Sequence, residues 1–196
     1  MKLKLNEKGA IVANRWQQTS QPHIYAAGDV CLKDKFTHAA EASALVAVQN
    51  ALLLGRRRLS ALTIPWCTYT DPEIAHVGLY VRDAWKKAIP VKTFTIVMHD
   101  VDRAVTDGEE EGFVKIHVRD GTDQILGATV VARHAGEMIN GLSLAITSGI
   151  GLRALAKVIH TYPTQAEAIK MAADAYCRSS VSPGRKSLIR RWLARR

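Results

Sequence analysis

Cysteine is scarce in this sequence, and its three copies lie far apart. Cys31, Cys67 and Cys177 form no Cys-x-x-Cys pair among the 196 residues. A sparse and odd count argues against a disulfide framework and against a zinc site. Each thiol is therefore expected to act as a small apolar residue. We predict no metal ligands among these residues, and a protein of the reducing cytoplasm.

Long hydrophobic runs are also absent. The longest candidate, ALVAVQNALLLG over 44–55, is interrupted by Gln49 and Asn50. It falls short of the roughly 18–20 apolar residues that a membrane-spanning helix needs. The first ten residues lack the apolar core of a secretory signal. Hydrophobic residues still make up 47% of the chain, so it can form a packed core. Its length suits one domain plus part of another.

Positive charge is in excess, but it is unevenly placed. The net charge is +9, and the stretch RKSLIRRWLARR over 185–196 holds six basic residues and no acid. The main body is therefore only modestly basic, and we expect no nucleic-acid partner. On a helix, the apolar residues of this tail would share one face. That pattern predicts weak contact with an anionic membrane surface, or a solvated chain end.

The first segment, 1–58, has the pattern of strands followed by a helix. GAIVAN over 9–14 and HIYAAGDV over 23–30 are short apolar runs that predict strands. THAAEASALVAVQNALLLG over 37–55 is rich in Ala and Leu and predicts a helix, with Gly55 suited to the position after its end.

From about residue 64, strand patterns follow one another. Phe113, Lys115 and His117 alternate with Val114, Ile116 and Val118, a pattern that indicates a strand. Similar patterns predict strands at 66–70, 73–79, 91–101, 112–120 and 124–132, and helices at 81–88, 135–149, 151–159 and 164–176. We predict an α+β fold, an antiparallel sheet with helices on one side.

A Gly-Asp turn is the first candidate binding feature. Gly28 and Asp29 follow the apolar run HIYAA, and a helix begins near Thr37. Ligands gather at the carboxyl ends of strands in open α/β sheets, and the free amides of a helix start favour anionic or carbonyl-rich groups. An Asp in such a turn can accept hydrogen bonds from sugar hydroxyls. The alternative is a tight turn followed by a helix cap.

A family resemblance extends this interpretation. The runs QTSQPHIYAAGDV and THAAEA resemble the second flavin-binding stretch of the pyridine nucleotide–disulfide oxidoreductases, which include lipoamide dehydrogenase, glutathione reductase and mercuric reductase. The runs IPWCTYTDPEIAHVGL, DRAVTDGEEEGFVKIHV and ILGATVVARHAGEMIN resemble that family's dimerisation domain. The resemblance implies that Asp29, after Gly28, binds the ribityl chain of FAD. It also implies that the backbone of Thr37, His38 and Ala39 approaches the flavin pyrimidine ring.

The stretch HTYPTQAEAIKMAADAY over 160–176 is the candidate catalytic element. On its residues alone it could be a catalytic loop or an ordinary helix start. In lipoamide dehydrogenases, His-Pro is followed four residues later by Glu, and the His acts as acid–base in the partner subunit's active site. Here Tyr162 precedes Pro163, Glu167 matches the Glu, and His160 lies two residues before the Tyr. Mercuric reductases place a tyrosine at this point.

A tyrosine changes the expected chemistry. With an ordinary pKa of about 10, it is a poor thiol base but a suitable hydrogen-bond donor or metal neighbour. Two features depart from the mercuric reductase pattern. The chain ends in RRWLARR, where those enzymes carry a vicinal cysteine pair, and Pro163 is closer to the lipoamide type. The alternatives are packing of Tyr162 at an interface, a plain first-turn acid at Glu167, and an ordinary end-of-helix residue at His160.

The resemblance implies the following assignment. Residues 1–58 would be the end of an α/β FAD-binding domain, 59–178 a dimerisation domain and 179–196 a basic tail. The intact enzyme would use FAD and NAD(P)H, act as a homodimer and resemble mercuric reductase. The usual dinucleotide loops and redox cysteine pair are absent from this sequence, so the chain alone is expected to be inactive. The alternatives are a lipoamide-dehydrogenase type using His160, and a stand-alone dimerisation module.

Overall fold

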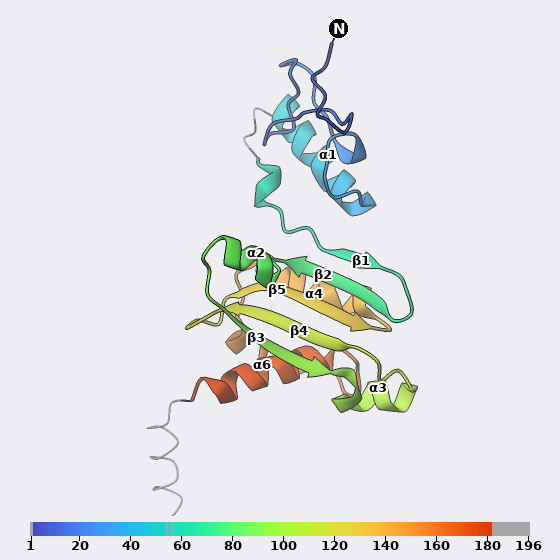
Figure 1. Cartoon of the computed structure of the whole chain (residues 1–196), viewed down its shortest axis with the longest axis vertical. Helices are drawn as coiled ribbons and strands as arrows, with labels where there is room; N and C mark the ends of the chain where they lie inside the picture. Colours follow the sequence, from blue (N-terminus) through green and yellow to red (C-terminus); the bar gives the residue numbers. More distant parts are fainter. Residues whose placement is uncertain (1, 54, 56, 182–196) are drawn as a thin grey trace, which may run out of the picture. The chain divides into compact units, whose positions relative to one another are not determined.

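The computed structural model describes residues 2–53, 55 and 57–181. The predicted basic tail over 185–196, with its expected membrane contact, lies outside these residues. The chain divides into two compact units between Ile64 and Pro65, both visible in Figure 1. Among the described helices, none has the length and apolar content to cross a membrane.

The first unit is organised around α1 (Thr37–Leu52), preceded by the 3-10 turn η1 (Gly28–Val30) and followed by η2 (Leu59–Ala61). Ser43 ties helix and turn together, because its hydroxyl accepts the Gly28 N–H at 2.8 Å. The helix predicted over 37–55 is confirmed over most of its length, because α1 covers Thr37–Leu52.

The two strands predicted in this unit were wrong. The segments 9–14 and 23–30 form only isolated bridges, Leu5 with Ile11 and Gln18 with Tyr25. A strand is stabilised by a ladder of hydrogen bonds to a neighbouring strand. The described part of this unit offers no such sheet, so an apolar β-branched run is not sufficient by itself.

The second unit is a five-stranded antiparallel sheet with the order β1-β2-β5-β4-β3. Its helices follow the strands or connect them. The strands are β1 (Trp66–Thr68), β2 (Glu73–Gly78), β3 (Val91–Val97), β4 (Phe113–Arg119) and β5 (Ile125–Ala132). The helices are α2 (Val81–Lys86), η3 (Met98–Asp100), α3 (Asp102–Asp107), α4 (Ala135–Thr147), α5 (Leu152–Leu155) and α6 (Glu167–Ser179). The predicted α+β class is confirmed.

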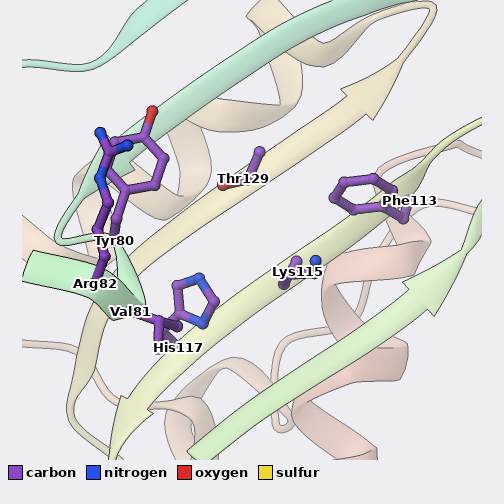
Figure 2. A pocket seen from close by; sticks show the side chains of 7 residues that line it. All are labelled: Tyr80, Val81, Arg82, Phe113, Lys115, His117 and Thr129. Atoms are coloured by element: carbon purple, nitrogen blue, oxygen red, sulfur yellow. The ribbon is translucent and has the colours of Figure 1, made fainter. Parts of the chain in front are cut away.

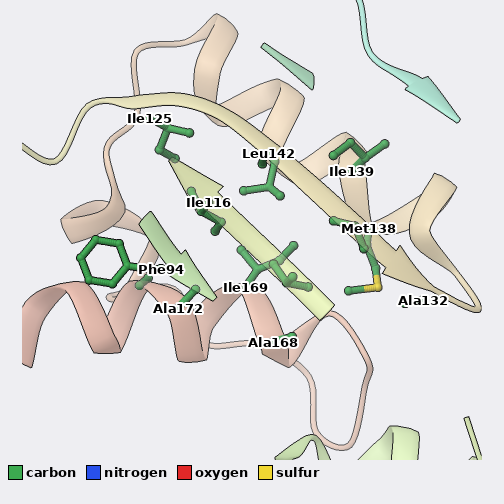
Figure 3. Packing of buried hydrophobic residues seen from close by; sticks show 14 of the residues in the cluster. Phe94, Ile116, Ile125, Ala132, Met138, Ile139, Leu142, Ala168, Ile169 and Ala172 are labelled. Atoms are coloured by element: carbon green, nitrogen blue, oxygen red, sulfur yellow. The ribbon is translucent and has the colours of Figure 1, made fainter. Parts of the chain in front are cut away.

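The core lies between one face of this sheet and the helices α4 and α6. Val114, Ile116 and Val118, which form one side of the alternating pattern, point to that face and are fully buried. Leu142 of α4 and Ile169 of α6 pack on them, as Figure 3 shows. Burying a side chain of this size stabilises a fold by about 1.5–3 kcal/mol. The packing therefore holds the start of α6, which follows the candidate loop, against the sheet.

Two contacts position the connections at the sheet. The Glu73 carboxylate accepts the Gly136 N–H at 2.9 Å, so the acid of the Thr-Asp-Pro-Glu run caps the start of α4. Gly127 pairs with Gly78 across β5 and β2. A Cβ at Gly127 would collide with the backbone of Leu79, so only glycine permits this close approach.

The helices differ from the sequence prediction in three places. The helix predicted over 151–159 covers only Leu152–Leu155, and the one predicted from 164 begins at Glu167. The short helix α3, Asp102–Asp107, was not predicted. The residues between α5 and α6 are thereby left as a longer loop than expected.

Candidate functional site

The candidate loop runs between α5 and α6 and exposes apolar and aromatic side chains. Tyr162 is 64% exposed, and Ile159 is 95% exposed. His160 is half-buried, and its Nδ1 lies 3.3 Å from the Val158 carbonyl oxygen. No hydrogen bond or ion pair joins His160 to Glu167 within the described chain. The structure therefore does not form the His–Glu pair that the motif alone suggests.

Tyr162 is held instead by a residue far away in sequence. Its hydroxyl donates a hydrogen bond to Asp102 Oδ2 at 2.8 Å. Asp102 is the first residue of α3. This bond raises the pKa of the Tyr162 phenol, and the charges of Asp102 and, to a smaller extent, Glu167 add to the effect. The phenol is thus protonated at neutral pH, and a phenol in this state is a poor base.

The same loop meets α3 at a second point. Gln165 is only 4% exposed and lies near the Asp107 carboxyl. The pKa of Asp107 is lowered mainly by the Arg103 guanidinium, which donates to its Oδ2 at 2.8 Å, and to a smaller extent by Gln165. Neither amide atom of Gln165 reaches full hydrogen-bond geometry with a described residue. The loop therefore lies against both ends of α3, with Tyr162 at Asp102 and Gln165 beside Asp107.

The predicted flavin-contacting residues gather at η1 and the start of α1. Gly28 has φ +72°, and a Cβ there would stand 3.2 Å from the Ala40 Cβ, so the turn lies against the first turn of the helix. The side chains of Asp29, Thr37 and His38 are exposed, whereas Ala39 is fully buried. Phe36 precedes the helix and supplies no side-chain cap. The first amides of α1 are thus not capped from that position, which fits a carbonyl-rich ligand edge.

A pocket of about 290 Å³, which was not predicted from the sequence, lies on the sheet face opposite α4 and α6. In Figure 2, Tyr80, Arg82 and His117 lie at one end and Phe113 at the other, with Thr129 and Lys115 between them. The Tyr80 ring stacks on His76 at 3.6 Å between centroids. The sequence did contain an indication of this pocket, because Lys115 and His117, the polar residues of the alternating pattern in β4, line this face.

Two buried histidines belong to this region: His117 lines the pocket, and His76 stacks on Tyr80 beside it. His76 is 2% exposed and His117 is 4% exposed. The Nδ1 of each lies 2.9 Å from a threonine hydroxyl, Thr129 and Thr93 respectively. Burial is the main cause that lowers both pKa values, and together with the charges of His76 and Lys115 it brings the pKa of His117 to about 4. Both rings are therefore neutral at physiological pH.

The described residues contain no group of three or more His, Cys, Asp or Glu side chains placed to hold a metal ion. Cys31, Cys67 and Cys177 are free thiols. Burial raises the pKa of Cys31 and of Cys67, with a further increase at Cys67 from the Glu73 charge. These two thiols are therefore weak nucleophiles at neutral pH.

Residues 64–173, more than half of the chain, match the model of the pyridine nucleotide-disulphide oxidoreductase dimerisation domain. The chain belongs to this family. Residues 1–50 match a second model, described as pyridine nucleotide-disulphide oxidoreductase. The two matches correspond to the two units of the structure.

Relatives of two kinds are similar to this chain to the same degree. A mercuric reductase of Streptomyces lividans is 36% identical over 174 residues, which cover 89% of this chain and 37% of the relative. A dihydrolipoyl dehydrogenase of Thermus scotoductus is also 36% identical, over 179 residues that cover 91% of this chain and 38% of the relative. The chain thus spans little more than a third of their length. Overall identity does not separate the two kinds.

Solved structures have the same fold. LpdA from Mycobacterium tuberculosis is 28% identical and has a TM-score of 0.82, over 89% of this chain and 38% of that chain. The flavoprotein disulfide reductase RclA from Escherichia coli is 24% identical and has a TM-score of 0.80, over 88% of this chain and 40% of that chain. The likeness to RclA concerns the fold alone.

Proposed function

We propose that this chain supplies part of the FAD site and the homodimer interface of an FAD-dependent NAD(P)H oxidoreductase that resembles mercuric reductase. The observation that carries the proposal is Tyr162, which stands exposed directly before Pro163 and five residues ahead of Glu167. In this proposal Tyr162 reaches the partner subunit's active site. FAD, when bound, would pass electrons from NAD(P)H to a disulfide or a thiol-bound metal ion.

The residues around η1 suit a flavin cofactor. The Asp29 carboxylate would accept hydrogen bonds from ribityl hydroxyls, and Gly28 lets the backbone turn tightly against α1. The amides of Thr37, His38 and Ala39 would face the carbonyl edge of the ring system. Ala39 would take part through its backbone only, because its side chain is buried.

The candidate loop suits burial by a second copy of the chain. Ile159, Val158 and Tyr162 are 95%, 47% and 64% exposed in the single chain. Contiguous exposed apolar groups of this kind are typical of protein–protein contacts, and tyrosine is enriched there. Glu167 at the start of α6 would then lie beside the interface and close to Tyr162.

The choice of Tyr162 over His160 rests on their environments. Tyr162 presents its ring to solvent, whereas His160 is half-buried and has its Nδ1 directed at its own loop through Val158. A group that acts on a partner's substrate must come within about 2.6–3.2 Å of it. The exposed ring is the better placed of the two.

A chimeric enzyme tests this proposal. The chain would replace the aligned segment of the Streptomyces lividans mercuric reductase, and Hg(II)-dependent NADPH oxidation would be measured. We expect Tyr162→Phe to lower turnover at least tenfold, about 1.4 kcal/mol of transition-state stabilisation. Turnover should persist in His160→Ala and in Tyr69→Phe, a control at another exposed tyrosine. Loss of turnover in His160→Ala alone would favour the lipoamide-dehydrogenase type instead.

Sedimentation of the purified chain tests the interface. We expect a homodimer that Ile159→Asp converts to monomer, because a carboxylate would be buried without a partner. Trp85→Asp serves as the control, since Trp85 is also exposed, at 71%, but lies on α2. A dimer that withstands Ile159→Asp and breaks with Trp85→Asp would place the interface elsewhere.

A further inference from the structure

A phenol has a single proton to donate, and at Tyr162 that proton is already used. The hydroxyl donates to Asp102 Oδ2 at 2.8 Å. The remaining capacity of the phenolic oxygen is its lone pairs, which accept hydrogen bonds or contact cations. The partner of a catalytic tyrosine therefore decides which kind of group the tyrosine can serve.

We propose that Asp102 is a positioning residue for Tyr162, which it holds as a neutral phenol whose outward-facing oxygen can only accept a hydrogen bond or contact a cation. This inference rests on the proposed function for its catalytic meaning. It narrows that function, because Tyr162 then cannot act as a general base or as a donor to the substrate while the bond to Asp102 persists.

The contacts between the loop and α3 support the positioning role of Asp102. Asp102 begins that helix and Asp107 ends it, and the loop touches both through Tyr162 and Gln165. The Gln165 side chain is buried beside the end of α3, whereas the Tyr162 ring stays largely exposed. The hydrogen bond therefore fixes the direction of an exposed ring that would otherwise sample several rotamers.

The local charge indicates the class of substrate. The carboxylate of Asp102 lies 2.8 Å from the phenolic oxygen, and Glu167 adds negative charge. Negative potential at that oxygen attracts a metal cation and opposes the formation of a free thiolate, whose charge no metal neutralises, beside it. A thiol-bound metal cation therefore suits this site better than a dithiol does.

Tyrosine titration by nuclear magnetic resonance tests the inference on the chain itself. The Cζ resonances of the five tyrosines would be followed with pH, and Tyr162→Phe would assign the signal of Tyr162. We expect its pKa to lie above the ordinary value of 10.0. Asp102→Asn should lower it towards that value, and Asp102→Glu should keep it raised.

Asp100→Asn is the matched control, since Asp100 is exposed in the adjoining turn and pairs with His99 at 3.0 Å. It should leave the Tyr162 titration unchanged. The inference is overturned if Asp102→Asn leaves the Tyr162 pKa as it was, or if Asp100→Asn lowers it equally. Circular dichroism of each variant confirms that the fold is intact. If the titration responds as expected and Tyr162→Phe leaves the chimeric enzyme active, the positioning stands and the proposed function fails.

Discussion

His117 should make the stability of the second unit depend on pH. It lies on β4 facing the pocket, 4% exposed, with His76 buried nearby. Burial is the largest cause that lowers its pKa from 6.5 to about 4, and the charges of His76 and Lys115 contribute further. The folded chain therefore keeps this ring neutral at pH values where the unfolded chain would protonate it.

The sign and size follow from proton linkage. Between pH 6.5 and 4 the unfolded state binds a proton at His117 that the folded state refuses, so stability falls as pH falls. Above pH 6.5 the contribution of the neutral His117 ring to the free energy of unfolding is fully present, and below pH 4 this contribution is lost. Each pKa unit corresponds to 1.36 kcal/mol, so the free energy of unfolding should drop by roughly 2–3 kcal/mol between pH 7.5 and 4.5.

Urea unfolding of the purified chain, followed by circular dichroism at pH 4.5, 5.5, 6.5 and 7.5, measures this dependence. His117→Gln keeps a polar group opposite Thr93 but cannot titrate, so its stability should fall less over that range. His99→Gln is the control, because the His99 side chain is 64% exposed. If the wild type and His117→Gln lose stability equally between pH 7.5 and 4.5, the reasoning from burial is refuted.

Two further predictions concern stability and use the same unfolding assay. Gly127→Ala should cost about 2 kcal/mol or more, because its Cβ would strike the Leu79 backbone at a site that cannot relax cheaply. Gly141→Ala in α4 meets open space and should instead stabilise by about 0.5–1 kcal/mol; equal effects at the two glycines would contradict the steric argument. Glu73→Ala should cost about 1 kcal/mol, because the Gly136 N–H at the start of α4 loses its acceptor. Glu73→Gln, which keeps an acceptor, should cost less; a larger loss would show that charge matters more than the hydrogen bond.

Much of the second unit could be predicted because each strand has a local pattern. Val114, Ile116 and Val118 recur with a period of two and face one core, so their direction follows from sequence alone. The same rule failed for 9–14 and 23–30, where apolar runs formed only isolated bridges. A strand depends on a partner strand, and a local pattern cannot show whether a partner is present.

The candidate site was predictable only in part. The motif placed Tyr162 and Pro163 just ahead of a helix that carries Glu167, and the structure has that loop and that helix. The short helix α3 has no strong periodic signal, so the acceptor for Tyr162 could not be found from the sequence. The burial of His117 could not be predicted from the sequence either, because the exposure of a side chain depends on which other residues cover it and not on its position in a strand.

The succession of the five strands along the second unit, and the positions of most of its helices, could be predicted from the sequence itself. The family resemblance and the replacement of a histidine by Tyr162 before Pro163 were also readable there. Only the tertiary structure decided that Asp102, sixty positions before Tyr162, accepts the hydrogen bond of the Tyr162 hydroxyl, and that His76 and His117 are both buried. Local patterns depend on neighbours along the chain, whereas hydrogen-bond partners and burial depend on which distant segments the fold brings together.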